Sequence, residues 1–325
     1  MIRPARFLVL RGGAIGDFIV TLPVFSALRA RWPDSYIEVI GYPHIARLAE
    51  VAGLVDRVRG LDTARMARFF GRRPTIDEAT RQYLASFDCV LSYLHDPDGL
   101  VAENLTAAGV RRLLYRSPLG PSEHIVDHLL RPLESLAIYE RGAVPRLPLT
   151  ERFVAEGRAC WQATGLTSPP VVIHPGSGGR AKIWPWEGFR EVARFLRDQS
   201  QQTLLFLLGE ADHELRARVA EAAAELNAPW IEGLSLLEVA SLLSASAGYL
   251  GNDSGITHLA AAVGIPVVAL FGPTDPTIWG PRGPRVHLVT SSTGTMAGIR
   301  TEEVLEAVKQ ALRMRDRAPN DPEHD

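Results

Sequence analysis

The stretch LRGGAIGDFIVTLP (residues 10–23) places an acidic side chain, Asp17, at the start of a helix that follows a glycine-rich turn. A dinucleotide-binding fingerprint needs glycine at three fixed places after a strand. Gly13 and Gly16 fit the last two places, but Arg11 occupies the first. An acidic group at the helix start would also repel a pyrophosphate. The stretch therefore predicts a loop that presents Asp17 to something other than a dinucleotide.

A second acidic helix start lies in GNDSGITHLAAAVGIPVVALFGP (residues 251–273). Asp253 or Ser254 is expected to cap this helix, and Gly255 leaves the first backbone N–H groups accessible, which suits a phosphate. His258 lies one turn further along. Taken alone, an N-cap followed by glycine is usually only a cap, and a lone helical histidine is usually a packed or surface residue.

The stretch HPGSGGRAKIWPWEGF (residues 174–189) ends a strand in a glycine-rich turn, and Lys182 follows the turn. Lysine is scarce in this chain, because arginine takes most basic positions. A lysine beside such a turn is a candidate phosphate ligand, whereas the simpler interpretation is a solvated loop lysine.

Short apolar runs alternate along the chain with amphipathic helical patterns, which is typical of parallel sheets covered by helices. The expected strands are residues 7–10, 37–40, 89–94, 171–174, 204–208, 249–250 and 267–271. The fold class is therefore α/β.

The chain is expected to consist of two Rossmann-like, doubly wound domains, residues 1–150 and 151–325. Prolines gather around the join, and the strand-and-turn VVIHPGSGG restarts the pattern of FLVLRGGAIG. Two such units would leave a cleft between them, lined by loops at the carboxyl ends of both sheets. The polar, proline-containing tail from Arg315 to Asp325 is expected to be disordered.

Composition indicates an ordinary soluble globular protein. Of the 325 residues, 46% are hydrophobic and 22% charged, and the net charge of −2 gives no general case for nucleic-acid binding. The two cysteines, Cys89 and Cys160, lack a metal-ligand spacing. The first apolar run is too short for a signal peptide, and no run is long enough to span a membrane, so we expect a cytoplasmic protein.

Four stretches together resemble glycosyltransferase family 9, the bacterial ADP-heptose:lipopolysaccharide heptosyltransferases. They are GDFIVTLP, HPGSG followed by AKIWPWEGF, LGEADHE, and GNDSGITHLAAAVGIPVVALFGPTDP, in that order over nearly the whole chain. The resemblance implies a GT-B fold, in which the first domain binds mainly the acceptor and the second binds the nucleotide-sugar donor.

The resemblance also implies the roles of the residues singled out above. Asp17 matches the catalytic base that removes a proton from the acceptor hydroxyl, a step worth about 10²–10⁴-fold in rate. Lys182 matches a lysine that contacts the donor phosphates. The remaining positions expected around the donor are Ser177, Gly178, Asp253, Ser254, Gly255 and His258.

In LGEADHE, the family commonly has an acidic residue that binds the nucleotide ribose. Either Glu210 or Asp212 could supply it, and the longer reach of Glu210 favours that residue slightly.

Three further segments are acceptor candidates in the first domain. HDPDG (residues 95–99) contains Asp96 in an Asp-x-Asp pair that imitates a metal motif, but a loop at a strand end is the simpler account. His124 lies in EHIVDH. The segment TARMARFFGRRP, with Arg65 and Arg68, could meet a phosphorylated glycolipid or an anionic membrane, or could be a solvated face.

The sequence therefore predicts an inverting glycosyltransferase that moves a sugar, heptose from ADP-heptose by the resemblance, to a lipopolysaccharide-core or other saccharide acceptor. No obligatory metal and no nucleic-acid partner are expected. One alternative is a transferase that uses another nucleotide-sugar; another is a catalytically silent binding relative. A nicotinamide-dependent oxidoreductase is disfavoured by Arg11.

Overall fold

The structure is a computed structural model that describes residues 4–72 and 75–315. Its contacts divide the chain between Pro145 and Arg146 into two units, each built on its own parallel sheet. The sequence places the join five residues later, between Thr150 and Glu151. The expected tail beyond residue 315 lies outside the described residues, as does Arg73 of the segment TARMARFFGRRP.

The first unit carries a five-stranded sheet in the order β3-β2-β1-β4-β5. Its strands are β1 (Arg6–Leu10), β2 (Tyr36–Gly41), β3 (Arg57–Gly60), β4 (Cys89–Ser92) and β5 (Leu113–Tyr115). Its helices are α1 (Ile15–Ile19), α2 (Leu22–Arg31), α3 (Pro43–Val51), α4 (Ala64–Ala67), α5 (Glu78–Ala85), α6 (Leu100–Ala107) and α7 (Ile125–Leu130), with 3-10 turns η1 (Arg68–Phe70) and η2 (Arg131–Leu136).

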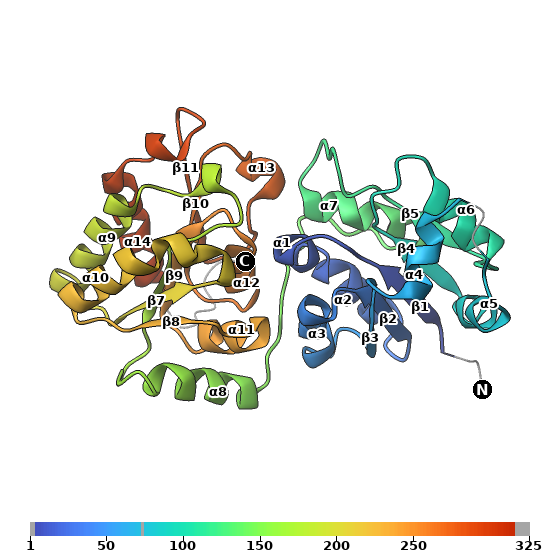
Figure 1. Cartoon of the computed structure of the whole chain (residues 1–325), viewed down its shortest axis with the longest axis horizontal. Coiled ribbons are helices and arrows are strands. Elements are labelled where there is room, and N and C mark those ends of the chain that lie inside the picture. Colours follow the sequence, from blue (N-terminus) through green and yellow to red (C-terminus); the bar gives the residue numbers. More distant parts are fainter. Residues whose placement is uncertain (1–3, 73–74, 316–325) are drawn as a thin grey trace, which may run out of the picture. The chain divides into compact units, whose positions relative to one another are not determined.

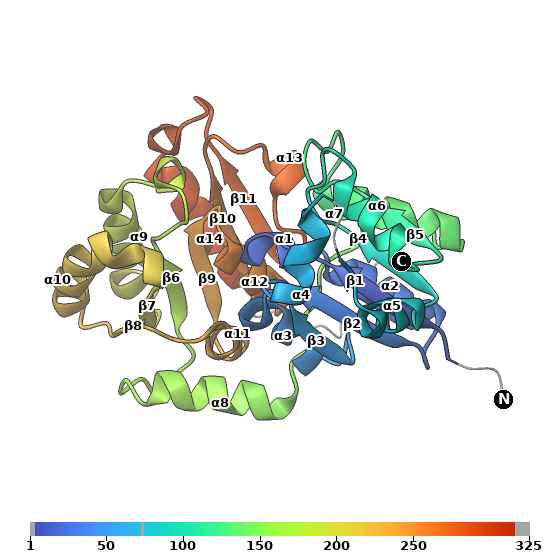
Figure 2. The ribbon, with the colours of Figure 1, turned by 45° about the vertical axis from the view of Figure 1, so that its right-hand side comes forward.

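The second unit carries a six-stranded sheet in the order β11-β10-β9-β6-β7-β8, which can be followed in Figure 2. Its strands are β6 (Val171–His174), β7 (Leu204–Leu208), β8 (Trp230–Glu232), β9 (Gly248–Asn252), β10 (Val267–Phe271) and β11 (Val286–Thr290). Its helices are α8 (Glu151–Gln162), α9 (Trp186–Asp198), α10 (Arg216–Leu226), α11 (Leu236–Ser244), α12 (Gly255–Ala262), α13 (Pro276–Trp279) and α14 (Thr301–Arg315), with 3-10 turns η3 (Arg180–Lys182), η4 (Glu210–Leu215) and η5 (Met296–Gly298).

Both sheets confirm the expected doubly wound α/β class. All strand pairs are parallel, and the strand order reverses between β1 and β4 in the first sheet and between β6 and β9 in the second. In such sheets, ligands bind outside the carboxyl ends of the strands at this switch point. The loops after β1, β4, β6 and β9 are therefore where a site is expected in each unit.

Buried apolar runs form the central strands, as the sequence predicts. Every residue of β4, β6, β7 and β10 is buried, because helices cover both faces of a parallel sheet. Figure 1 shows α9 and α10 beside the second sheet. None of the helices in the described part of the chain is long and apolar enough to cross a membrane.

Helix α8 follows the join and packs against α11, and the two helices lie side by side in Figures 1 and 2. This close approach requires glycine at position 157, since a Cβ there would lie 1.8 Å from the carbonyl oxygen of Ser241. The Trp161 indole also donates to the Ala245 carbonyl over 3.2 Å. Helix α8 therefore belongs to the second unit.

Candidate active site

Asp17 lies at the carboxyl edge of the first sheet, where the loop after β1 leads into α1. It is the third residue of α1 rather than the N-cap, which is Ala14. Its Oδ2 accepts a hydrogen bond from the Ala14 N–H over 2.9 Å, and the side chain remains 33% exposed. The carboxylate is thus held at the helix start and still accessible to a ligand.

Gly13 shapes this turn for two separate reasons. Its φ of +94° lies in the left-handed region that favours glycine, and a Cβ at this position would lie 2.7 Å from Asp17 Oδ2. Gly16, the other glycine that fits the fingerprint, lies inside α1 instead. The turn therefore needs glycine at position 13 both for its backbone and for the space that Asp17 occupies.

Arg11 is a residue that the sequence marks only as a departure from the dinucleotide fingerprint. Its side chain is 2% exposed, and its Nη2 lies 3.3 Å from Asp17 Oδ1. An arginine directly after a buried strand is the signal that could have identified it, because a buried guanidinium requires acceptors nearby.

Asp96, one of the acceptor candidates of the first unit, has local hydrogen-bond partners. Asp96 is 7% exposed, and its two carboxylate oxygens accept the N–H groups of Val101 and Ala102 over 3.0 and 2.9 Å. It therefore anchors the start of α6, which agrees with the simpler account of the HDPDG loop. Among the described residues, no group of three or more His, Cys, Asp or Glu side chains is placed to hold a metal.

His124 and Arg68 also have structural contacts. His124 is the N-cap of α7, and its Nδ1 accepts the Val126 N–H over 3.2 Å. Arg68 pairs with Asp77 over 3.1 Å, with both side chains about half exposed. The side chain of Arg65 lies outside what the structure describes. An acceptor role for these residues stays a prediction.

Lys182 and Asp253, which are far apart in the sequence, meet in the second unit. Lys182 ends η3 after β6, Asp253 follows β9, and the Lys182 Nζ lies 2.7 Å from Asp253 Oδ2. The lysine side chain is 37% exposed and the aspartate 8%. Lys182 is therefore fixed by a charge partner beside the switch point and is not an ordinary solvated loop lysine.

The glycine-rich loop after β6 is tied to the end of β9 by side chains. Ser177 Oγ donates to the Asp253 carbonyl over 2.9 Å. Asn252, fully buried and not singled out from the sequence, donates to the Pro175 carbonyl over 2.8 Å and accepts the Trp184 N–H over 3.1 Å. These bonds fix both ends of the loop, while Gly178 at its middle is exposed.

The start of α12 lies beside this loop. Ser254, not Asp253, is the N-cap, and its Oγ accepts the Thr257 N–H over 3.3 Å. Gly255 is the first helical residue, and His258 is buried within the first turn. The first N–H groups of a helix carry partial positive charge, so Lys182 and this helix start together favour an anion.

Glu210 and Asp212 follow β7 and differ in environment. Asp212 is 4% exposed, and its Oδ2 accepts the Gly209 N–H over 2.7 Å and a hydrogen bond from His174 Nε2 over 3.1 Å. Burial alone would raise the pKa of Asp212, but the bond and charge of His174 and the Gly209 N–H hold it below its usual value. Glu210 is exposed, and ribose binding by either residue stays a prediction.

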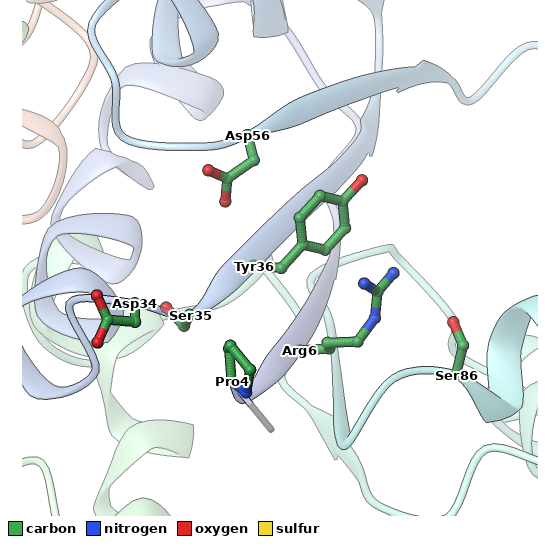
Figure 3. A pocket seen from close by; sticks show the side chains of 7 residues that line it. All are labelled: Pro4, Arg6, Asp34, Ser35, Tyr36, Asp56 and Ser86. Carbon is green, nitrogen blue, oxygen red and sulfur yellow. The ribbon is translucent and has the colours of Figure 1, made fainter. Parts of the chain in front are cut away.

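A pocket of about 510 Å³ also opens in the first unit, but at the amino ends of β1 and β2 (Figure 3). Its lining includes Arg6, Ser35, Tyr36 and Asp56. The Asp56 carboxylate already accepts the Ile37 N–H over 2.7 Å. Since ligands of doubly wound sheets bind at the opposite edge, we assign this pocket no part in the chemistry of Asp17.

Two doubly wound parallel units, one with a carboxylate at its switch point and the other with a lysine and a helix start there, fit the class of two-domain nucleotide-sugar transferases. A family model described as glycosyltransferase family 9 (heptosyltransferase) matches residues 120–309. Lipopolysaccharide heptosyltransferase 1 of Pseudomonas aeruginosa is 34% identical over 317 residues, covering 87% of this chain and 83% of that protein. The chain belongs to glycosyltransferase family 9 and is a glycosyltransferase, as the sequence predicts.

Solved structures agree on the fold. Escherichia coli ADP-heptose LPS heptosyltransferase II has a TM-score of 0.77 at 20% identity and covers 96% of this chain and 100% of its own. An E. coli heptosyltransferase solved with ADP has a TM-score of 0.72 at 19% identity, covering 94% and 99%. At these identities the likeness shows the fold alone, and it confirms the expected GT-B class.

Proposed function

We propose that this protein is an inverting heptosyltransferase that transfers heptose from ADP-heptose to a saccharide of the lipopolysaccharide core. The first unit would bind the acceptor, which corresponds to the proposed domain 1–150. The second would bind the donor, which corresponds to 151–325.

One observation carries the proposal: Lys182, Asp253 and the start of α12 gather at the switch point of the second sheet, where the 2.7 Å ion pair fixes the lysine. A diphosphate in this position would meet an ammonium group and the first N–H groups of α12. Ser177, Gly178, Ser254, Gly255 and His258 would complete its surroundings. These groups would offset part of the charge of the diphosphate without a metal.

The names of the relatives support adenine and heptose as parts of the donor. One similar structure is that of an ADP-heptose LPS heptosyltransferase, and another contains ADP. In this chain, Glu210 is the exposed acid after β7 and would accept hydrogen bonds from the ribose hydroxyls. Asp212 would not contact the ribose but would stabilise the turn that carries Glu210, through its hydrogen bond from the Gly209 N–H.

The reaction requires one proton transfer and one displacement. The acceptor hydroxyl attacks the anomeric carbon of the donor sugar, and its proton passes to the Asp17 carboxylate. The bond between the anomeric carbon and the β-phosphate oxygen breaks, and ADP leaves with its electron pair. Lys182 would stabilise the charge that grows on that oxygen.

Acceptor binding by Arg65, Arg68, Asp96 and His124 stays a prediction. Asp96 is the least suited of the three whose side chains are described, because backbone N–H groups already occupy both of its oxygens. A cytoplasmic location with peripheral contact with the inner membrane likewise stays a prediction.

The experiment that tests the donor is a thermal-shift panel of ADP, UDP, GDP and CDP, followed by turnover assays with the matching nucleotide-sugars. A ligand at 100 times its dissociation constant stabilises the folded state by about 2.7 kcal/mol. We expect ADP alone among these to do so and ADP-heptose to be turned over. Stabilisation by another nucleotide would indicate a different donor, and ADP binding without turnover on any core acceptor would indicate a silent relative.

The assignment of the base is tested separately. Asp17→Asn should leave ADP affinity unchanged and lower kcat by about 10² or more, because it removes the proton acceptor and leaves the donor residues intact. Near-normal turnover would exclude Asp17 as the base.

A further inference from the structure

Arg11 lies directly after β1, with its guanidinium buried at 2% exposure. Burial lowers the pKa of Arg11, and the Asp17 carboxylate is the strongest opposing influence. A buried guanidinium is tolerated only where acceptors satisfy its N–H groups. The position of Arg11 is therefore tied to that of Asp17.

Arg11 binds the backbone of Asp17 as well as its side chain. The Asp17 carbonyl accepts hydrogen bonds from Arg11 Nη2 over 2.6 Å, from Arg11 Nε over 3.0 Å and from Thr21 Oγ1 over 2.8 Å. Because α1 ends at Ile19, the Thr21 N–H bonds to the Phe18 carbonyl and not to that of Asp17. The guanidinium and the Thr21 hydroxyl take the place of the missing helical bond.

The carboxylate itself is held from two sides. Arg11 Nη2 donates to Oδ1 over 3.3 Å, and the Ala14 N–H donates to Oδ2 over 2.9 Å. One donor on each oxygen fixes the rotation of the group and leaves further lone pairs for a substrate hydroxyl. A misplacement of about 1 Å in such a group costs on the order of 10²-fold in rate.

Arg11 also joins the two loops that flank the switch point of the first sheet. Its Nη1 donates to the carbonyl of Tyr93, the residue after β4, over 3.4 Å. The loop that carries Asp17 and the loop after β4 are thus held by the same side chain.

We propose that Arg11 is a positioning residue for the general base, because its guanidinium fixes both the backbone and the carboxylate of Asp17. The inference rests on the proposed function, in which Asp17 takes the proton of the acceptor hydroxyl. Its alternative is a purely structural arginine that supports the end of α1.

The test compares Arg11→Met, Arg11→Lys, Asp17→Asn and the double variant Arg11→Met/Asp17→Asn in the full chain. Arg11→Met should lower kcat by about 10- to 10²-fold with ADP affinity unchanged. Arg11→Lys keeps the charge without the planar fork and should give an intermediate kcat. The double variant should be no slower than Asp17→Asn. Once the base is absent, losing the residue that positions it should have no further effect on the rate.

Arg29→Met is the matched control. Arg29 in α2 is a partly buried arginine of the same unit that pairs with Asp56 over 2.8 Å. Its loss should lower the melting temperature and leave kcat unchanged. An equal fall in kcat for Arg29→Met would show that instability of the unit lowers turnover, and it would overturn the inference.

The remaining outcomes separate the inference from the proposed function. Normal turnover of Asp17→Asn would overturn the assignment of Asp17 as the base, and the inference about Arg11 with it. A slow Asp17→Asn beside a fully active Arg11→Met would overturn the inference alone, as would rate losses that multiply in the double variant. If Arg11→Met does not fold, Arg11→Lys decides, and wild-type kcat in that variant overturns the inference.

Discussion

The local sequence of Lys182 favours a solvated loop lysine, but in the structure its side chain is paired with Asp253. Its ammonium group neutralises Asp253, a carboxylate that is 8% exposed. Removing the lysine therefore does two things: it deletes a charge that would stabilise the leaving diphosphate, and it leaves an acidic group unpaired beside the proposed phosphate position.

Lys182→Ala should lower kcat by about 10²–10³ because a preorganised donor to the developing charge is lost. It should also weaken ADP binding, since the unpaired Asp253 repels the diphosphate. The double variant Lys182→Ala/Asp253→Asn should recover ADP affinity without recovering kcat. Calorimetric ADP binding and steady-state kinetics with saturating acceptor measure the two effects.

Lys309, the other lysine of the chain, supplies the control. It lies on α14 with its Nζ 4.9 Å from the centre of the Phe195 ring. Lys309→Ala should leave both ADP affinity and kcat unchanged. Normal turnover of Lys182→Ala would instead make the start of α12 the main phosphate-binding feature.

At the scale of elements, the turn between β1 and α1 depends on Gly13. Alanine at a φ of +94° costs about 1–2 kcal/mol, and its Cβ would also displace the Asp17 carboxylate. Gly13→Ala should therefore lower the melting temperature and reduce kcat by about 10² with ADP binding intact.

Gly53 offers a control of the same backbone type. Its φ is +70°, and no atom lies within 4 Å of an added Cβ. Gly53→Ala should lose a similar amount of stability with no loss of kcat. Equal kcat for the two variants would mean that the turn does not set the position of Asp17.

The strands also differ in how well the apolar runs of the sequence predict them. The seven strands expected from apolar runs are all present, whereas β3, β5, β8 and β11 were not expected. These four strands are the edges of the two sheets. An edge strand has one bonded neighbour and is only partly buried, so its sequence carries a short apolar run at most.

For the whole molecule, ion pairs and caps predict how stability depends on pH. Asp198, Glu225 and Glu238 have a pKa held below the ordinary 3.8 of Asp or 4.5 of Glu. The cause is chiefly a hydrogen bond, from arginine to Asp198 and Glu225 and from the cap residue Ser235 to Glu238. Asp212 joins them through His174. The others are Glu123, Glu134, Asp275 and Glu303.

A lowered folded pKa contributes stability above the unfolded value, and that stability is lost as the pH falls through the folded value. The melting temperature should therefore decline as the pH falls below 4.5. Burial raises the pKa of Cys89 from 9.0 to about 11, so its contribution is complete below 9.0 and is lost as the pH rises further. Circular-dichroism melts across this range measure both limbs, and a melting temperature that is constant from about pH 5 to pH 3 would contradict the acid limb.

The sequence by itself determined the α/β class, the central strands, the family and most of the candidate residues. These features are local: apolar runs, glycine turns, helix caps and ordered motifs leave their signal within a few neighbouring positions. Candidates such as Asp17, Lys182 and Ser254 are therefore recognisable from the amino-acid order alone.

The tertiary structure alone decided which side chains meet. It paired Lys182 with Asp253 and Arg11 with Asp17, turned Asp212 inward against His174, and gave both oxygens of Asp96 to the start of α6. The first three pairings form because the sheets and the start of α1 bring the loops that carry these residues close together. The type of a polar residue does not by itself say whether its side chain will be buried. A buried charge requires a partner. The tertiary structure therefore decides whether a charged side chain stays accessible to a ligand or is paired inside the protein.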